Sequence, residues 1–112
     1  MRTITAEELK QMKERGQDFL LVNTLSEEDF EATHIPDAIN IPQVGEDFAE
    51  QVERQAGSKD KPVVVYCAST QCQSSHHGAE KLEAAGFRNV IDFEGGAKEW
   101  ESAGMELVSH GG

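Results

Sequence analysis

Two patterns of hydrophobic and polar positions alternate along the chain. Short continuous apolar runs at residues 19–22 and 63–66 have the length of strands, and the lack of polar alternation fits strands covered on both faces. Residues 89–93 predict another strand. Two prolines bracket a short apolar alternation within residues 34–42, which predicts a brief strand between loops.

Segments with helical spacing of apolar residues separate these runs. Thr5 and Glu8 form a capping box ahead of an apolar stripe that ends at Gly16, and Ser26 begins a capped helical turn. Further helices are predicted at residues 46–55, 75–85 and 97–103. Because strands alternate with helices, we expect an α/β fold in which helices cover both faces of a parallel sheet.

The composition limits size, compartment and partners. A chain of 112 residues with 38% apolar content predicts a single domain over residues 1–112. Apolar stretches are too short to span a membrane and the N-terminus lacks the apolar core of a secretory signal, so we expect a cytoplasmic protein. The net charge of −11 disfavours binding to nucleic acid or to anionic membranes. The oligomeric state stays open.

Two cysteines, Cys67 and Cys72, are too few for a disulfide framework. Cys67 follows the most apolar strand, and a polar loop then leads into a helix. Ligand sites of open α/β sheets lie at the carboxyl ends of strands, and such a loop directs backbone N–H groups toward one point. We therefore expect a Cys67 thiolate with a pKa below about 8.5, although a small buried hydrophobe is the alternative reading of its position.

Several segments resemble the rhodanese-like domain in order and spacing. They are residues 34–42 (HIPDAINIP), 64–67 (VVYC), 85–90 (AGFRNV) and 94–104, which contains Glu94-Gly95-Gly96 and Trp100. The resemblance covers nearly the whole chain. It implies a five-stranded parallel sheet with helices on both faces, and a sulfurtransferase whose catalytic nucleophile, Cys67, carries sulfur as a persulfide.

The implied reaction moves sulfane sulfur from thiosulfate, a persulfide or a polysulfide to a thiol or cyanide, without a metal or organic cofactor. The partner is then a small sulfur-donor molecule or the thiol of another protein. The expected substrate-binding loop comprises Ala68, Ser69, Thr70, Gln71, Cys72, Gln73 and Ser74. Thr70 stands where the family usually has Gly, and residues 68–75 contain no Arg or Lys. We therefore expect thiosulfate to be a poor donor.

Other functions of this loop stay open. The related dual-specificity phosphatases need an Arg six residues after the cysteine, where this chain has Gln73, so phosphatase activity is disfavoured. Cys72 either resolves or protects Cys67, or points elsewhere. A zinc site with His76 and His77 is disfavoured because adjacent helical residues point about 100° apart.

The rival hypothesis is a non-catalytic rhodanese-like module that binds a partner or senses redox state. Two observations support this rival hypothesis. The loop lacks a cation, and Asn23 stands where the family often has the Asp of an Asp-x-Arg pair. Phe93 and Trp100 are expected in the core, His34 is expected to make a structural hydrogen bond, and the Tyr66 hydroxyl is expected at the rim of the site.

Overall fold

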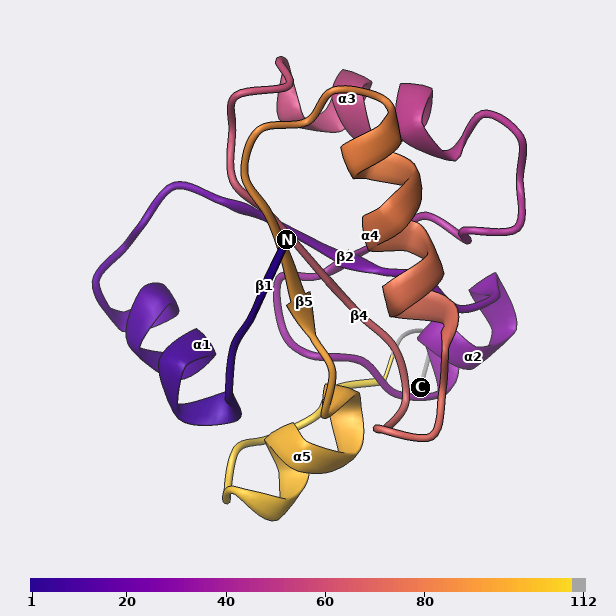
Figure 1. The fold of residues 1–112 in the computed structure, drawn as a ribbon. Helices are drawn as coiled ribbons and strands as arrows, with labels where there is room; N and C mark the ends of the chain where they lie inside the picture. Colours follow the sequence, from indigo (N-terminus) through magenta and orange to yellow (C-terminus); the bar gives the residue numbers. More distant parts are fainter. Residues whose placement is uncertain (110–112) are drawn as a thin grey trace.

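A central parallel sheet lies between two groups of helices in a computed structural model, which describes residues 1–109 (Figure 1). The strands are β1 (Arg2–Thr3), β2 (Leu20–Asn23), β3 (Ile39–Asn40), β4 (Val63–Tyr66) and β5 (Val90–Phe93). They pair in parallel in the order β1-β5-β4-β2-β3. The predicted five-stranded α/β sheet is confirmed, with the apolar β4 at its centre.

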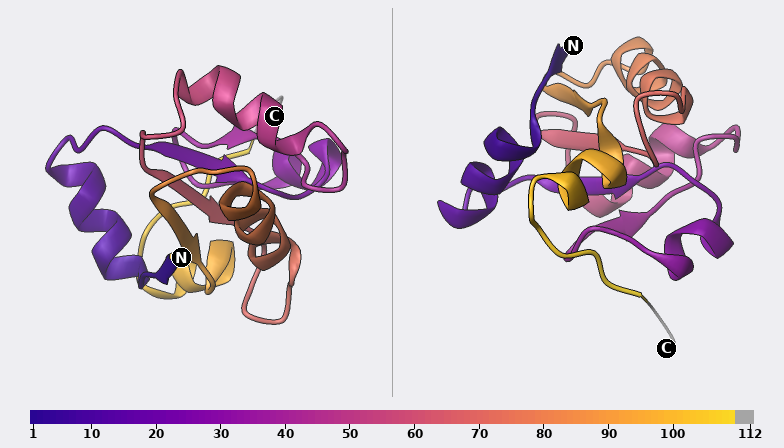
Figure 2. Two further views of the ribbon diagram at one scale, coloured as in Figure 1. Left: turned by 45° about the horizontal axis from the view of Figure 1, so that its top comes forward. Right: turned by 90° about the horizontal axis from the view of Figure 1, so that it is seen from below.

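Four helices connect successive strands, and a fifth follows the last strand. They are α1 (Ala6–Glu14), α2 (Glu27–Ala32), α3 (Phe48–Ala56), α4 (Ser74–Ala84) and α5 (Gly96–Ser102). The two views of Figure 2 show α1 and α5 on one side of the sheet and α3 and α4 on the other. The bounds of α3, α4 and α5 differ from the predicted ranges by at most two residues. Among the described residues, no helix is long and apolar enough to cross a lipid bilayer.

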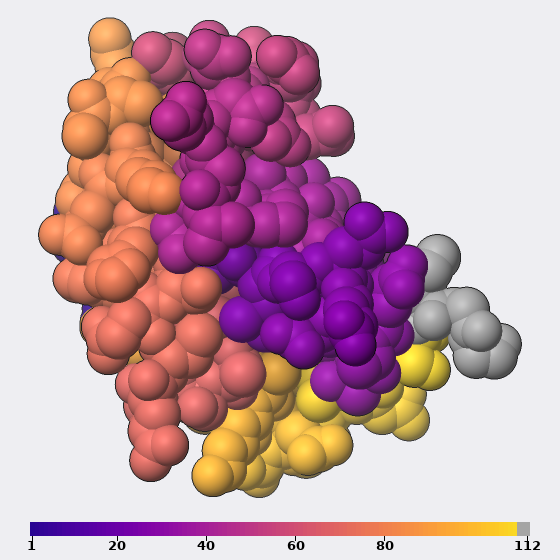
Figure 3. Space-filling model, turned by 90° about the vertical axis from the view of Figure 1, so that its right-hand side faces the viewer, coloured from indigo at the N-terminus to yellow at the C-terminus, as the bar shows by residue number. Residues whose placement is uncertain are grey.

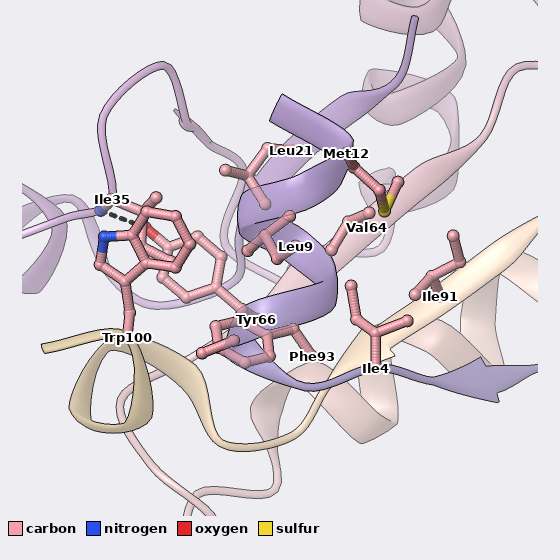
Figure 4. Close-up of a cluster of buried hydrophobic side chains, with 11 residues drawn as sticks. Ile4, Leu9, Met12, Leu21, Ile35, Val64, Tyr66, Ile91, Phe93 and Trp100 are labelled. Atoms are coloured by element: carbon pink, nitrogen blue, oxygen red, sulfur yellow. Dashed lines mark hydrogen bonds between the residues drawn. The ribbon is translucent and has the colours of Figure 1, made fainter. Parts of the chain in front are cut away.

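Alternating side chains of β4 build a separate core on each face of the sheet. Val64 and Tyr66 pack with residues of α1 and α5, as Figure 4 shows, whereas Val63 and Val65 pack with residues of α3 and α4. Both faces of β4 are therefore covered, as its uninterrupted apolar run predicts. Phe93 and Trp100 lie in the first of these cores, which confirms their predicted place.

The prediction for the Tyr66 hydroxyl is wrong. Tyr66 is fully buried and its hydroxyl accepts a hydrogen bond from the Ile35 N–H at 3.0 Å (Figure 4), because the alternation of β4 points this side chain into the core rather than toward the loop. His34 makes the structural hydrogen bond expected of it, with 2.8 Å between its Nδ1 and the carbonyl oxygen of Phe30.

Candidate functional site

The loop between β4 and α4 lies at the carboxyl edge of the sheet. Figure 3 shows it at the molecular surface between α4 and α5. The first residues of α5 fix its beginning, since the Ala97 N–H donates to the Cys67 carbonyl oxygen and the Lys98 N–H donates to that of Ala68, both at 2.9 Å. Gly96 permits this approach, because an added Cβ would lie 2.2 Å from the Cys67 oxygen.

The Cys67 side chain has no exposed surface. Its nearest polar neighbours are the carbonyl oxygen of Cys72 at 3.4 Å, the hydroxyl oxygen of Ser75 at 3.7 Å and the carbonyl oxygen of Ser69 at 4.0 Å. Carbonyl oxygens accept hydrogen bonds and repel an anion. The loop therefore suits a protonated Cys67 thiol.

Burial raises the pKa of Cys67, and its hydrogen bond with the Cys72 side chain adds to this effect, while the N–H and hydroxyl of Ser75 oppose it. The expected lowering of this pKa is therefore wrong, because burial outweighs the loop amides. Burial also acts on Cys72. There, however, hydrogen bonds from the Cys67 side chain and from the N–H groups of Ser74 and Ala68 prevail and lower the pKa of Cys72.

A cavity of about 240 Å³ opens beside the two cysteines. It is lined by Thr70, Cys72, Gln73, Ser75, His76, Asp92 and Glu94. Three residues of the predicted substrate-binding loop, Thr70, Cys72 and Gln73, thus lie in its wall. Cys67 stands directly behind the wall, because Ser75 and Cys72 both line the cavity and contact its sulfur.

The other predicted loop residues are placed by the structure outside this lining. These are Ala68, Ser69, Gln71 and Ser74. Their backbone and side chains organise the loop: the Ser69 hydroxyl accepts a hydrogen bond from the Gln71 N–H at 3.3 Å, and the Ser69 carbonyl oxygen accepts one from the Cys72 N–H at 3.0 Å. The loop thereby forms a turn that presents Cys72 and Gln73 to the cavity.

Asp92 and Glu94, at the end of β5, are the cavity residues that sequence reasoning did not single out. The Asp92 side chain is fully buried, and neither carboxylate oxygen has a hydrogen-bond partner within residues 1–109. Burial raises the pKa of Asp92, and the neighbouring Glu94 raises it further. Ser75 and His76 lower this pKa, although the Ser75 hydroxyl makes no hydrogen bond of ordinary geometry with the carboxylate. A charged residue inside an apolar strand is rare, and that signal was available in the sequence.

His76 is the basic side chain of the cavity lining that lies near this carboxylate. Its Nδ1 lies 3.8 Å from Asp92 Oδ2, beyond hydrogen-bonding distance, and its Nε2 lies 3.6 Å from Glu80 Oε1. The His77 ring lies 6.4 Å away, centroid to centroid. Within the described part of the chain, His, Cys, Asp and Glu side chains form no group of three or more that suits a metal ion.

Residues 5–103 match the family model of the rhodanese-like domain. Over 114 residues the chain is 34% identical to the HTH-type transcriptional regulator Rv0324 of Mycobacterium tuberculosis, which covers 96% of this chain and 47% of the regulator. It thus spans about half the length of that relative. Over 102 residues it is 29% identical to the thiosulfate sulfurtransferase GlpE of Pseudomonas syringae, which covers 90% of this chain and 88% of GlpE.

Solved structures share the fold. The BH2092 protein of Bacillus halodurans superposes with a TM-score of 0.82 at 25% identity, covering 96% of this chain and 77% of that one. A thiosulfate sulfurtransferase of Pseudomonas aeruginosa superposes with a TM-score of 0.88 at 23% identity, covering 100% of this chain and 21% of that one. The latter likeness concerns the fold alone.

Proposed function

This chain belongs to the rhodanese-like domain family, and we propose that it is a sulfurtransferase in which Cys67 carries sulfane sulfur as a persulfide. The observation that most supports the proposal is the position of Cys67: it directly follows the central strand and lies behind the wall of a polar cavity. The match to GlpE, a thiosulfate sulfurtransferase, supports the reaction class.

The proposed reaction has two displacement steps. The Cys67 thiolate attacks the outer sulfur of a donor, which is thiosulfate, a persulfide or a polysulfide, and the sulfur–sulfur bond of the donor breaks. A thiol or cyanide then attacks the outer sulfur of the Cys67 persulfide and releases the Cys67 thiolate. The N–H and hydroxyl of Ser75, which favour the ionised form of Cys67, would stabilise the anion in both steps.

Charge around the cavity favours donors that are not strongly anionic. Asp92 and Glu94 line the cavity, and residues 68–75 supply no Arg or Lys to offset them. Two like charges about 4 Å apart in a partly desolvated site repel each other by about 4 kcal/mol at an intermediate dielectric constant. A persulfide or a partner protein's cysteine persulfide is therefore the proposed donor, with thiosulfate a slower one.

A sulfur-transfer assay of the wild type and of Cys67→Ser tests this proposal. Thiosulfate, an organic persulfide and polysulfide serve as donors with cyanide as the acceptor, and thiocyanate is measured. We expect turnover with at least one donor, fastest with the persulfide, and loss of turnover in Cys67→Ser. Exposed His77 on α4 supplies a control, since His77→Ala should keep wild-type turnover. Equal turnover of the wild type and Cys67→Ser would contradict the proposal.

A second candidate function is redox sensing without turnover. It is favoured by the position of the two cysteines in one loop, where the Cys67 sulfur lies 3.4 Å from the Cys72 carbonyl oxygen, because neighbouring thiols can be joined by an oxidant such as hydrogen peroxide. The match to a transcriptional regulator fits a sensory module. Formation of a Cys67–Cys72 disulfide by peroxide, together with no turnover on any donor, would favour this candidate over the sulfurtransferase.

A further inference from the structure

The buried residue Asp92 lines the cavity beside Cys67, whose sulfur is the proposed reacting atom. Both carboxylate oxygens of Asp92 lack a hydrogen-bond partner within residues 1–109 although the side chain is fully buried. Buried carboxylates are normally paired or hydrogen-bonded, because removing an unpaired charge from water costs several kcal/mol. Because residues 1–109 supply no hydrogen-bond partner for this carboxylate, we look for one in a ligand of the cavity.

The other groups that line the cavity indicate which kind of ligand it suits. Glu94 contributes a second carboxylate, Ser75 and Thr70 contribute hydroxyls, and Cys72 contributes a thiol. His76 does not satisfy Asp92, since its Nδ1 stays 3.8 Å away and its other ring nitrogen lies near Glu80. The wall thus combines an acidic side, at the end of β5, with a sulfur side formed by the loop.

We propose that this cavity binds a small aminothiol as the sulfur acceptor, with its protonated amine against Asp92 and Glu94 and its sulfur toward the loop cysteines. The proposal rests on the sulfurtransferase function. A volume of about 240 Å³ is below the range of roughly 300–1,000 Å³ that drug-sized ligands occupy, and this favours a short molecule. An ammonium group supplies the hydrogen bonds that the buried carboxylate lacks, and its charge complements that of the carboxylate.

The transfer step balances without an added oxidant. The aminothiol sulfur, as a thiolate, attacks the outer sulfur of the Cys67 persulfide and forms a new sulfur–sulfur bond. The bond between that outer sulfur and Cys67 breaks, and its electron pair stays on the Cys67 sulfur as a thiolate. The products are the aminothiol persulfide and free Cys67, and the transferred sulfur keeps its oxidation state.

Three acceptors of similar size and different charge test the proposal on the full chain. Cysteamine, 2-mercaptoethanol and 3-mercaptopropionate carry a positive, a neutral and a negative group. Their second-order rates with the persulfide-loaded protein are compared after division by the thiolate concentration of each acceptor. We expect the wild type to prefer cysteamine over 2-mercaptoethanol by about tenfold, and to use 3-mercaptopropionate least.

Three variants distinguish the effect of the cavity from that of the general acidity of the protein. Asp92→Asn should reduce the preference for cysteamine over 2-mercaptoethanol by about tenfold, whereas Glu94→Gln should have a smaller effect because Glu94 is exposed. Glu101→Gln removes the same charge from an exposed position on α5 and should leave the preference unchanged. The part of the cysteamine preference that depends on Asp92 should persist in high salt, because salt screens a buried ion pair only weakly.

The outcomes distinguish this inference from the proposed function. Sulfur transfer without a charge preference, or with a preference that Asp92→Asn and Glu101→Gln reduce equally, would overturn the aminothiol site while the sulfurtransferase proposal stands. If the wild type transfers sulfur to no acceptor, the sulfurtransferase proposal fails. The site is then judged by amide NMR shifts at Asp92 and Ser75 on titration with ethylammonium, with propionate as the control; shifts with ethylammonium alone support it, and equal or absent shifts overturn it.

Discussion

The two thiols lie five residues apart in one loop, but they differ in burial and in hydrogen bonding. One thiol is shielded from solvent and the other is accessible. Cys67 has no exposed surface and faces two carbonyl oxygens, whereas Cys72 is half-buried, lines the cavity and has backbone N–H groups near its sulfur. Thiolate fraction and access together set the reactivity of a cysteine. At rest, Cys72 is therefore the thiol that a reagent in solvent meets first.

Limiting alkylation with iodoacetamide at neutral pH checks this order. Cys72 should be labelled about ten times faster than Cys67, and its labelling rate should rise at a lower pH, because the pKa of Cys72 is lowered and that of Cys67 is raised. Fragment-ion mass spectrometry assigns the site, and Cys72→Ser reports Cys67 alone. Faster labelling of Cys67 would mean that the loop opens readily in solution.

Asp92 gives a pH-dependent prediction for stability. Because its folded-state pKa is raised, the folded protein binds this proton more tightly than the unfolded chain, so stability is lost as pH rises through the folded-state pKa. Asp92→Asn removes this loss and should raise the free energy of unfolding at pH 7 by about 1 kcal/mol. Below the unfolded-state pKa of about 3.9 the difference should shrink toward zero.

Urea unfolding of the wild type and Asp92→Asn at pH 7 and at low pH measures this difference. Glu101→Gln, with the same change of charge at an exposed position, should show no comparable gain. A less stable Asp92→Asn at pH 7 would indicate that the carboxylate is bound by a partner in solution.

At the scale of elements, α5 holds the beginning of the loop in place. The contact depends on Gly96, whose φ of 60° and close approach to the Cys67 carbonyl group both exclude a side chain. The cysteine directly follows β4, and the beginning of α5, which follows β5, fixes its carbonyl oxygen. The position of the loop between β4 and α4 therefore depends on a segment that is distant in sequence.

Gly96→Ala should consequently destabilise the protein by about 3 kcal/mol or more and reduce sulfur transfer, since the new Cβ must displace the Cys67 carbonyl group. Gly104 is the matched control. Its φ is 89°, yet an added Cβ would meet no atom of residues 1–109 within 4 Å, so Gly104→Ala should cost only about 1 kcal/mol. Urea unfolding of both variants measures the difference, and equal losses would rule out the clash as the cause.

Elements with local signals were predictable from the sequence. The capping box of Thr5 and Glu8 is present, and the apolar run of β4 has the predicted bounds. The strand β1 was missed because Arg2 and Thr3 are exposed and carry no apolar pattern; they are held by pairing with Ile91 and Asp92, far away in the chain.

The functional loop was predictable in place but not in chemistry. Its position after β4 follows from the strand pattern and from the family resemblance. The pKa of Cys67 depends on which carbonyl groups and N–H groups the folded loop turns toward the sulfur, and residue types do not specify that orientation. The acidic side of the cavity comes from β5, which only the sheet order brings beside the loop.

At the scale of the whole molecule, the net charge of −11 and the acidic cavity should both repel the anionic donors of the proposed reaction. Distant carboxylates are screened over about 8 Å at physiological ionic strength, whereas Asp92 and Glu94 act within the cavity itself. Salt therefore separates the two contributions. The part of the repulsion that salt removes belongs to the surface, and the part that persists belongs to the cavity.

Thiosulfate, a dianion, should accordingly become a better donor as salt is added, whereas bis(2-hydroxyethyl) trisulfide, a polysulfide without an ionisable group, should be used at a nearly constant kcat/KM. Gln73→Arg places a cation in the cavity wall and should raise kcat/KM for thiosulfate by about tenfold, because a guanidinium binds an oxyanion through two hydrogen bonds. Gln55→Arg adds the same charge on α3 and should change it less than twofold. Steady-state assays at low and high salt measure both effects. A kcat/KM for thiosulfate that falls with salt would mean that attraction, rather than repulsion, governs donor approach, and equal gains from the two arginines would assign the effect to net charge instead of to the cavity.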